Sequence, residues 1–216
     1  MEVGLLVNWK DIPKIDAHIH LMPEDVIQAN SGHGYVFIDY GSVDDYKKIM
    51  EKYNIDLAFV MPFNDPYMLS MDFKVETVHS NMLAMVQKMP LKLRCFADVD
   101  IRKNINETIN ELDKVITRDE FIGIKLHPSN AGYPIDGCYY EKIIEYASKK
   151  DILVEIHSYP KEHLQDDVCS PSRIKNVLKK YPNAKFSIAH LGGFQVEDLY
   201  GLKAYFNFSA ILPDYV

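Results

Sequence analysis

Short apolar runs alternate with amphipathic stretches along the chain, and this alternation limits the fold more than any other feature. Seven runs rich in Val, Ile and Phe have the length of strands, and the stretches between them carry apolar residues at helical spacings. Such alternation predicts a parallel sheet with right-handed crossovers and helices packed outside it. The seven runs are KIDAHIHL, DLAFVMPF, LRCFADVD, FIGIKLHP, ILVEIHS, KFSIAHLGG and AYFNFSAI.

The stretches between the runs carry helix signals of their own. Ser42 with Asp45 three residues later resembles a capping box, and Ser170 followed by Pro171 places proline at the first helical position. His79 lies beside the buried stripe of its helix, and we expect it to be structural. Buried stripes are predicted at Ile105, Ile109, Leu112 and Ile116, at Ile174, Val177, Leu178 and Tyr181, and at Val78, Met82, Met85 and Met89.

Repeated strand–helix units can form either a closed barrel or an open sheet. An open doubly wound sheet predicts a glycine-rich phosphate loop after the first strand, and HLMPEDV is no such loop. A TIM-like (β/α) barrel is therefore the expected fold, with its site at the carboxyl ends of the strands. At 216 residues with 47% hydrophobic residues, we expect a single domain over residues 1–216.

Composition narrows the partners and the compartment. The net charge is −7 and Lys and Arg are scattered, which argues against nucleic acid and favours a small-molecule substrate. Apolar runs fall well short of the roughly 20 residues that span a bilayer, and residues 1–11 lack the pattern of a signal peptide. The three cysteines lack metal or disulfide spacing, so a cytoplasmic location is expected. A homodimer is the default assembly.

Four histidines lie at the ends of predicted strands, where a barrel brings them to one mouth. Alternate strand residues share a face, so His18, His20 and Asp16 are expected to point the same way. Three imidazoles with one open position are typical of catalytic zinc, and His18, His20 and His157 could supply them. His190 would then polarise a substrate oxygen or hold the bound water. The alternative is that each is an isolated strand-end histidine, but four in register favour a site.

The fourth predicted strand adds two polar side chains on the same inward face, Lys125 and His127. Lys125 could bind an anionic substrate, bridge two metals if carbamylated, or pair with Glu155 inside the lumen, and the ion pair is slightly favoured. For His127, helix capping is as plausible as a role in ligand binding. Tyr159 is expected to line the pocket, so Lys125, His127 and Tyr159 form the predicted substrate-binding set.

Together, DAHIH, GIKLHP, the histidine of the fifth strand and AHLGG resemble the amidohydrolase superfamily. The nearest likeness is to its metal-dependent amidohydrolase-2 branch, which includes hydrolases and some decarboxylases, and it covers residues 14–212. The resemblance implies a TIM-like barrel that binds a divalent metal, zinc first, with manganese or iron as alternatives. It also implies that His18, His20 and His157 are the ligands and that His190 contacts the activated water or the substrate.

One element that is typical of the amidohydrolase superfamily, the eighth strand, is missing from this sequence. Members carry an aspartate at the end of an eighth strand, which binds metal and serves as general base, whereas seven strands are visible here. Asp214 follows the seventh run too closely to be that residue, because a parallel crossover needs a dozen or more residues. We expect a truncated carboxyl-terminal part; the alternative is a seven-stranded variant whose acid is replaced or lost.

The predicted function is metal-dependent hydrolysis of a small amide, ester or lactone by a metal-activated water. A nonoxidative decarboxylase of the same superfamily could use the same ligands. Phosphoesterases of the polymerase-and-histidinol-phosphatase type also open with an HxH strand and have seven strands, although AHLGG and GIKLHP argue against them. An inactive metal-binding barrel is the remaining alternative.

Overall fold

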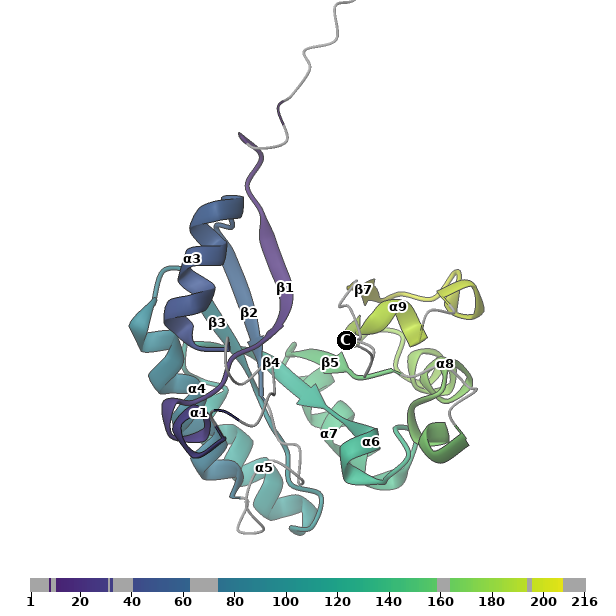
Figure 1. The fold of residues 1–216 in the computed structure, drawn as a ribbon. Coiled ribbons are helices and arrows are strands. Elements are labelled where there is room, and N and C mark those ends of the chain that lie inside the picture. The colour runs from purple at the N-terminus through teal and green to yellow at the C-terminus, as the bar shows by residue number, and fades with distance from the viewer. Residues whose placement is uncertain are drawn as a thin grey trace, which may run out of the picture.

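The computed structural model describes residues 8, 11–30, 32, 41–62, 74–158, 164–193 and 196–207. Seven strands form one sheet in the order β1 to β7, and each neighbouring pair is parallel. The sheet curls into a half-barrel, so that its edge strands β1 and β7 face each other (Figure 1), as the strand–helix alternation predicts. The strands are β1 (Ile15–His20), β2 (Leu57–Met61), β3 (Leu93–Ala97), β4 (Phe121–Leu126), β5 (Leu153–Ile156), β6 (Lys185–Ile188) and β7 (Tyr205–Phe206).

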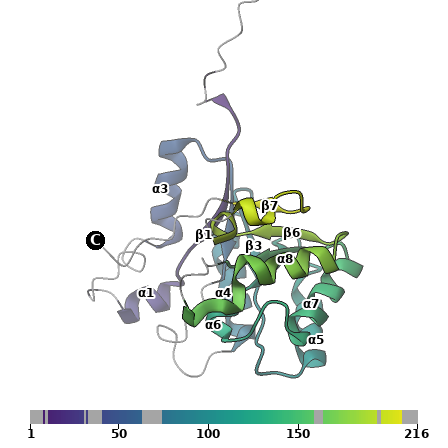
Figure 2. The ribbon, with the colours of Figure 1, turned by 90° about the vertical axis from the view of Figure 1, so that its right-hand side faces the viewer.

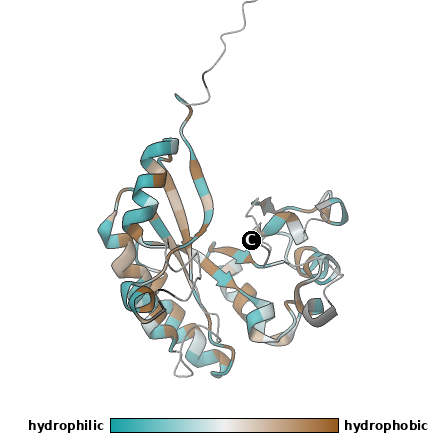
Figure 3. Ribbon diagram, viewed as in Figure 1, coloured by the Kyte–Doolittle hydropathy of each residue, from teal (hydrophilic) through white to brown (hydrophobic). Residues whose placement is uncertain are grey.

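The longer helices pack on the outside of the curled sheet (Figures 1 and 2). Both hydrophobic and hydrophilic residues occur along these helices (Figure 3), as amphipathic helices require. Within the described ranges, none of the helices has the length and apolar character needed to cross a membrane. The helices are α1 (Glu24–Asn30), α3 (Val43–Tyr53), α4 (Val75–Lys88), α5 (Ile105–Val115), α6 (Pro128–Ala131), α7 (Cys138–Lys149), α8 (Pro171–Lys180) and α9 (His190–Gly193), with 3₁₀ helices η2 (Leu164–Cys169) and η3 (Val196–Leu199).

The predicted helix starts and buried stripes are confirmed. The Ser42 hydroxyl accepts a hydrogen bond from the Asp45 amide at 3.0 Å, and Ser170 precedes Pro171 at the start of α8. Every residue of the three predicted stripes is either buried in the core or packed against it. This core fills the layer between the convex face of the sheet and the helices.

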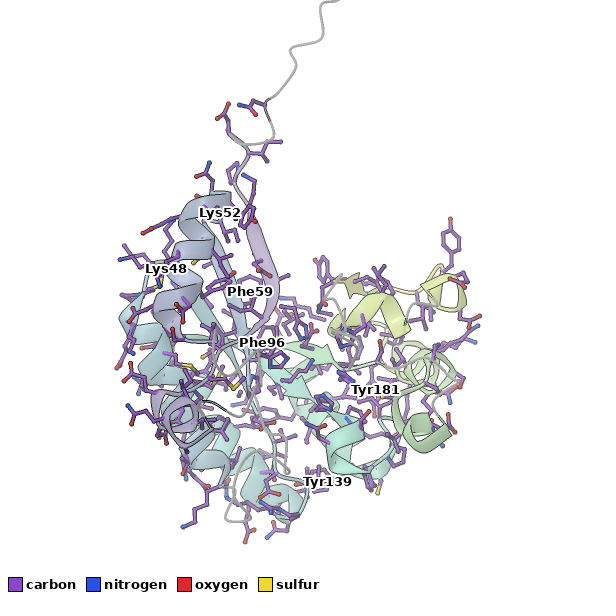
Figure 4. All side chains as sticks on the ribbon, in the orientation of Figure 1. Lys48, Lys52, Phe59, Phe96, Tyr139 and Tyr181 are labelled. Atoms are coloured by element: carbon purple, nitrogen blue, oxygen red, sulfur yellow. The ribbon has the colours of Figure 1, made fainter. Side chains whose placement is uncertain are left out.

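Inside the curl, aromatic rings occupy part of the lumen. Phe59 on β2 and Phe96 on β3 make an edge-to-face contact with ring centroids 6.4 Å apart, while Lys48 and Lys52 lie on the outer side of α3 (Figure 4). Gly123 on β4 makes room for this pair, because a Cβ there would lie 2.5 Å from the Phe96 ring. Aromatic rings therefore fill this part of the lumen, and the polar side chains of the candidate site lie toward the carboxyl ends of the strands.

A β-bulge in β1 corrects the prediction that Asp16 shares a face with the two histidines. The pairing of β1 with β2 shifts register between Asp16 and Ile19, which inserts one extra residue in β1. The Asp16 carboxylate accepts a hydrogen bond at 2.8 Å from the hydroxyl of Tyr46 on the outer helix α3. Asp16 therefore anchors the strand to its covering helix instead of joining the two histidines.

His79 has the structural role that its position predicts. It is buried, its Nε2 lies 3.0 Å from the amide nitrogen of Asp98, and its ring meets Phe121 edge-on. Nδ1 lies 3.7 Å from the Glu111 carboxylate. Burial lowers the pKa of His79 below its usual range, and the contacts with Asp98 and Glu111 only partly oppose this.

This lowered pKa makes the stability of the fold depend on pH. The unfolded chain takes up a proton at His79 near pH 6.5, whereas the folded chain does so only at lower pH, so acid favours unfolding in that window. Replacing His79 with Gln should lessen the loss of unfolding free energy below pH 6.5, by at most about 1.4 kcal/mol per pH unit. Urea unfolding of both proteins at several pH values measures this, and equal pH slopes would contradict it.

Candidate metal-binding and catalytic site

Histidines from three strands meet at the carboxyl end of the sheet. The ring centroids of His18 and His20, both on β1, lie 5.3 Å apart, and those of His18 and His190 lie 5.7 Å apart. His157 follows β5, and its ring centroid is 4.8 Å from that of His190, which follows β6. The predicted convergence of these four histidines is confirmed. Tyr159 lies outside the described residues.

His157 is held by rings on two sides. Its Nδ1 lies 3.2 Å from Nε2 of His190, and its ring stacks on that of His127 at 3.8 Å. His127 also caps α6, since its Nδ1 accepts a hydrogen bond from the amide of Asn130 at 3.2 Å. Capping was one of the two interpretations of His127 open from the sequence, and the stacking on His157 also places this ring within the histidine cluster.

A buried carboxylate ties the cluster together. Glu155 is fully buried on β5, and its Oε1 lies 3.0 Å from His18 Nδ1 and 3.8 Å from Lys125 Nζ. The side-chain amide of Asn207 donates to the same oxygen at 2.8 Å and to the hydroxyl of Ser187 at 3.2 Å. The favoured interpretation of Lys125, an ion pair with Glu155 in the lumen, is thus confirmed. The sequence did not single out Asn207 as a site residue. The one hint of its role is an amide side chain directly after the two residues of β7.

Burial keeps the imidazoles of His18, His20, His127 and His157 neutral at physiological pH. It lowers the pKa of His18 to about 2, with the charges of Lys125 and His190 adding to the effect. Burial likewise holds the pKa of His157 and that of His127 well below the usual range. The pKa of Lys125 is also lowered by burial, against the opposing attraction of Glu155. Neutral imidazole is the protonation state that binds a metal ion.

His190 stands on a left-handed turn. The residues of α9, His190 to Gly193, have φ angles of 52°, 47°, 68° and 73°. Each non-glycine residue in this conformation costs roughly 1–2 kcal/mol, so the two glycines make the turn less costly. Gly192 also lies against Leu199, because a Cβ there would be 2.7 Å from its side chain. Strain of this kind is concentrated at functional sites, and here it aims the His190 ring at His157.

The donor set has the chemistry of a divalent metal site. Two imidazoles on one tetrahedral ion, with bonds of about 2.1 Å, have ring centres roughly 5 Å apart, close to the His18–His20 separation of 5.3 Å. Among the residues that the structure describes, however, no three His, Cys, Asp or Glu side chains converge as a formed metal site. The residue types and their neutral state therefore fit a metal ion, and the assignment of ligands is carried forward as a proposal.

Comparison with known proteins shows the family of the chain. The model of the amidohydrolase family matches residues 15–215. The chain belongs to the amidohydrolase family. A search of curated proteins gives no significant match.

Several solved structures resemble this chain in fold. A probable 2-pyrone-4,6-dicarboxylic acid hydrolase from Acinetobacter baumannii is 19% identical, with a TM-score of 0.54 over 84% of this chain and 59% of its own. An uncharacterized TIM-barrel protein from Bordetella bronchiseptica is 11% identical, with a TM-score of 0.65 over 87% of this chain and 70% of its own. A 5-carboxyvanillate decarboxylase from Novosphingobium aromaticivorans, complexed with manganese, is 13% identical, with a TM-score of 0.65 over 89% and 69%. At these identities the likeness establishes the TIM-barrel-like α/β fold.

The Lys125–Glu155 pair leads to a prediction on stability. Replacing Lys125 with Met should lower the free energy of unfolding by about 3 kcal/mol, because it leaves a buried carboxylate without its counter-charge. Replacing Glu155 with Met as well should cost less than the sum of the two single replacements. Chemical denaturation of the wild type, both single variants and the double variant measures the coupling, and additive losses would contradict it.

The left-handed turn at His190–Gly193 gives a second prediction. Gly192→Ala should destabilise the chain by more than the roughly 1–2 kcal/mol expected for alanine in this backbone conformation, because its methyl group also meets Leu199. Gly201→Ala is the matched control, since Gly201 has φ of 81° and open space where a Cβ would lie. Chemical denaturation of both variants measures the difference, and equal losses would show that the contact with Leu199 is unimportant.

Proposed function

We propose that this chain is a metal-dependent hydrolase of small amides, esters or lactones. The observation that carries the proposal is the group of imidazoles, drawn from β1 and from the residues after β5 and β6, at the carboxyl end of a parallel sheet. In barrels of this architecture the active site lies at that end. His18, His20 and His157 would hold the ion.

A divalent ion in this position would lower the pKa of its bound water toward ~7 and polarise a carbonyl oxygen. The remaining steps fall to side chains of the chain itself. His190, held within hydrogen-bond distance of His157, would hold the attacking water or donate to the oxyanion that develops on the substrate. The aromatic layer formed by Phe59 and Phe96 would close the lumen beneath the reacting groups.

The lumen favours a substrate with a negative charge. Lys125 is almost fully buried near the histidine cluster, and its ammonium makes no hydrogen bond among the described residues, although Glu155 lies 3.8 Å away. A substrate carboxylate would supply such a bond, with His127 and Tyr159 completing the predicted binding set. Among the similar structures, the names of a dicarboxylic acid hydrolase and of a carboxyvanillate decarboxylase also point to carboxylated rings.

Nonoxidative decarboxylation is the second candidate function. It is favoured by the similar decarboxylase structure and by the position of Lys125, which suits a carboxylate substrate. The metal is proposed as divalent: zinc follows from the imidazole donor set, and manganese from the complexed metal of the decarboxylase structure. The family match favours either of these functions over the phosphoesterase alternative.

Metal content is the first test of the proposed function. The protein, His18→Ala and His157→Ala would each be loaded with zinc or manganese, desalted and subjected to elemental analysis. The wild type is expected to retain about one equivalent per chain, and both variants to lose it, because each removes one of three ligands. His79→Gln serves as the control, since that buried histidine lies in α4, away from the cluster, and its metal content should match the wild type.

Measuring the products of turnover distinguishes a hydrolase from a decarboxylase and from an inactive barrel. The metal-loaded chain would be offered lactones and esters with a ring carboxylate, with release of acid and of carbon dioxide followed in parallel. Acid release supports the hydrolase and carbon dioxide release supports the decarboxylase. Metal bound without either product would support the inactive metal-binding barrel, and no metal in the wild type would overturn the proposed ligand set.

A further inference from the structure

We propose that Glu155 is a positioning residue that fixes the tautomer and orientation of His18. In this arrangement the Nδ1 hydrogen of His18 is donated to the Glu155 carboxylate, which leaves Nε2 of His18 free to act as a ligand. The tautomer is inferred from the contacts of Glu155, whereas its consequence for an ion rests on the proposed function.

The contacts of Glu155 place the proton on Nδ1. Glu155 Oε1 lies 3.0 Å from His18 Nδ1, accepts from the amide of Asn207 at 2.8 Å and has the ammonium of Lys125 at 3.8 Å. Oε1 already acts as an acceptor, because the Asn207 amide donates to it. We infer that the His18 ring supplies the hydrogen of the second contact from Nδ1.

An ion pair with Lys125 does not by itself explain this geometry. The separation of 3.8 Å to Lys125 is longer than either of the two hydrogen bonds that Glu155 Oε1 makes to neutral groups. Oε1 is therefore the atom through which Glu155 meets the histidine, and its two short contacts are to His18 and Asn207 rather than to the ammonium.

Glu155 also controls how the two edges of the sheet approach each other. His18 belongs to β1 and Asn207 follows β7, and in the described part of the chain these edge strands have no backbone pairing with each other. A cavity of about 520 Å³ lies at this seam, lined in part by Asp16, His18 and Asn207. One carboxylate thus contacts side chains from both edges of the sheet, and the His18 ring is one of them.

The first test needs no variant of Glu155. The nitrogen-15 chemical shifts of His18 in the metal-free wild type report which ring nitrogen carries the hydrogen, and His18→Gln identifies the signals by their loss. A neutral ring protonated on Nδ1 is the expected result. Protonation of the neutral ring on Nε2 would overturn the proposal, whether or not the protein binds metal.

The second test removes the acceptor. Glu155→Met keeps the length of the side chain without its oxygens, and Glu155→Gln retains one acceptor oxygen for His18. Loss of an outer-shell partner typically weakens metal binding by roughly 10–100-fold, so the Met variant should bind zinc that much more weakly, and the Gln variant should lie nearer the wild type. Zinc affinity is measured by competition with a chromophoric chelator.

Glu111→Gln is the matched control. Glu111 is another buried glutamate beside a buried histidine, His79, at 3.7 Å, but it lies on α5, outside the cluster. This variant should leave zinc affinity and the His18 tautomer unchanged. Wild-type zinc affinity in Glu155→Met, with His18 still protonated on Nδ1, would overturn the proposal. Absence of zinc in the wild type would overturn the proposed function instead, and the tautomer measurement would still decide the role of Glu155.

Discussion

The carboxylate of Glu155, buried in the concavity of the sheet, is the constraint on which the rest of the site depends. A charge in this position is stable only if opposite charge and hydrogen bonds surround it, and Lys125, His18 and Asn207 supply them from three other parts of the sheet. Satisfying one carboxylate therefore brings together segments that are far apart in the sequence. One of these contacts is to His18, so the same carboxylate that joins these segments also holds a member of the histidine cluster.

Most of the fold follows from local patterns in the sequence. Strand runs, helix stripes and the caps at Ser42 and Ser170 could be predicted because each depends on residues a few positions apart. The parallel order of the strands followed in turn, since crossovers through helices permit little else. The clustering of the four histidines was also predictable, because all lie at or just beyond the carboxyl ends of parallel strands.

The parts that could not be predicted depend on the register between segments. Strict alternation placed Asp16 beside His18, but the bulge in β1 turns Asp16 toward Tyr46 on α3. Asn207 gave little warning, because an amide at the end of a short strand is usually solvated, and its role depends on a carboxylate 52 positions away. The left-handed turn at His190 was equally invisible: two glycines suggest a turn, but not that His190 and Leu191 also adopt positive φ.

The order of the strands has a consequence for folding kinetics. Every strand pairs with the one immediately before it in the sequence, so the sheet can grow by adding one strand–helix unit at a time, each closing a short loop. The contacts that join the two edges span far more of the chain: His18 meets Glu155 across 137 positions. Such long-range contacts carry the greatest loop-closure entropy and form last. The residues proposed for chemistry would then acquire their final geometry only after the sheet is assembled, so unfinished chains during synthesis would carry the histidines without the site.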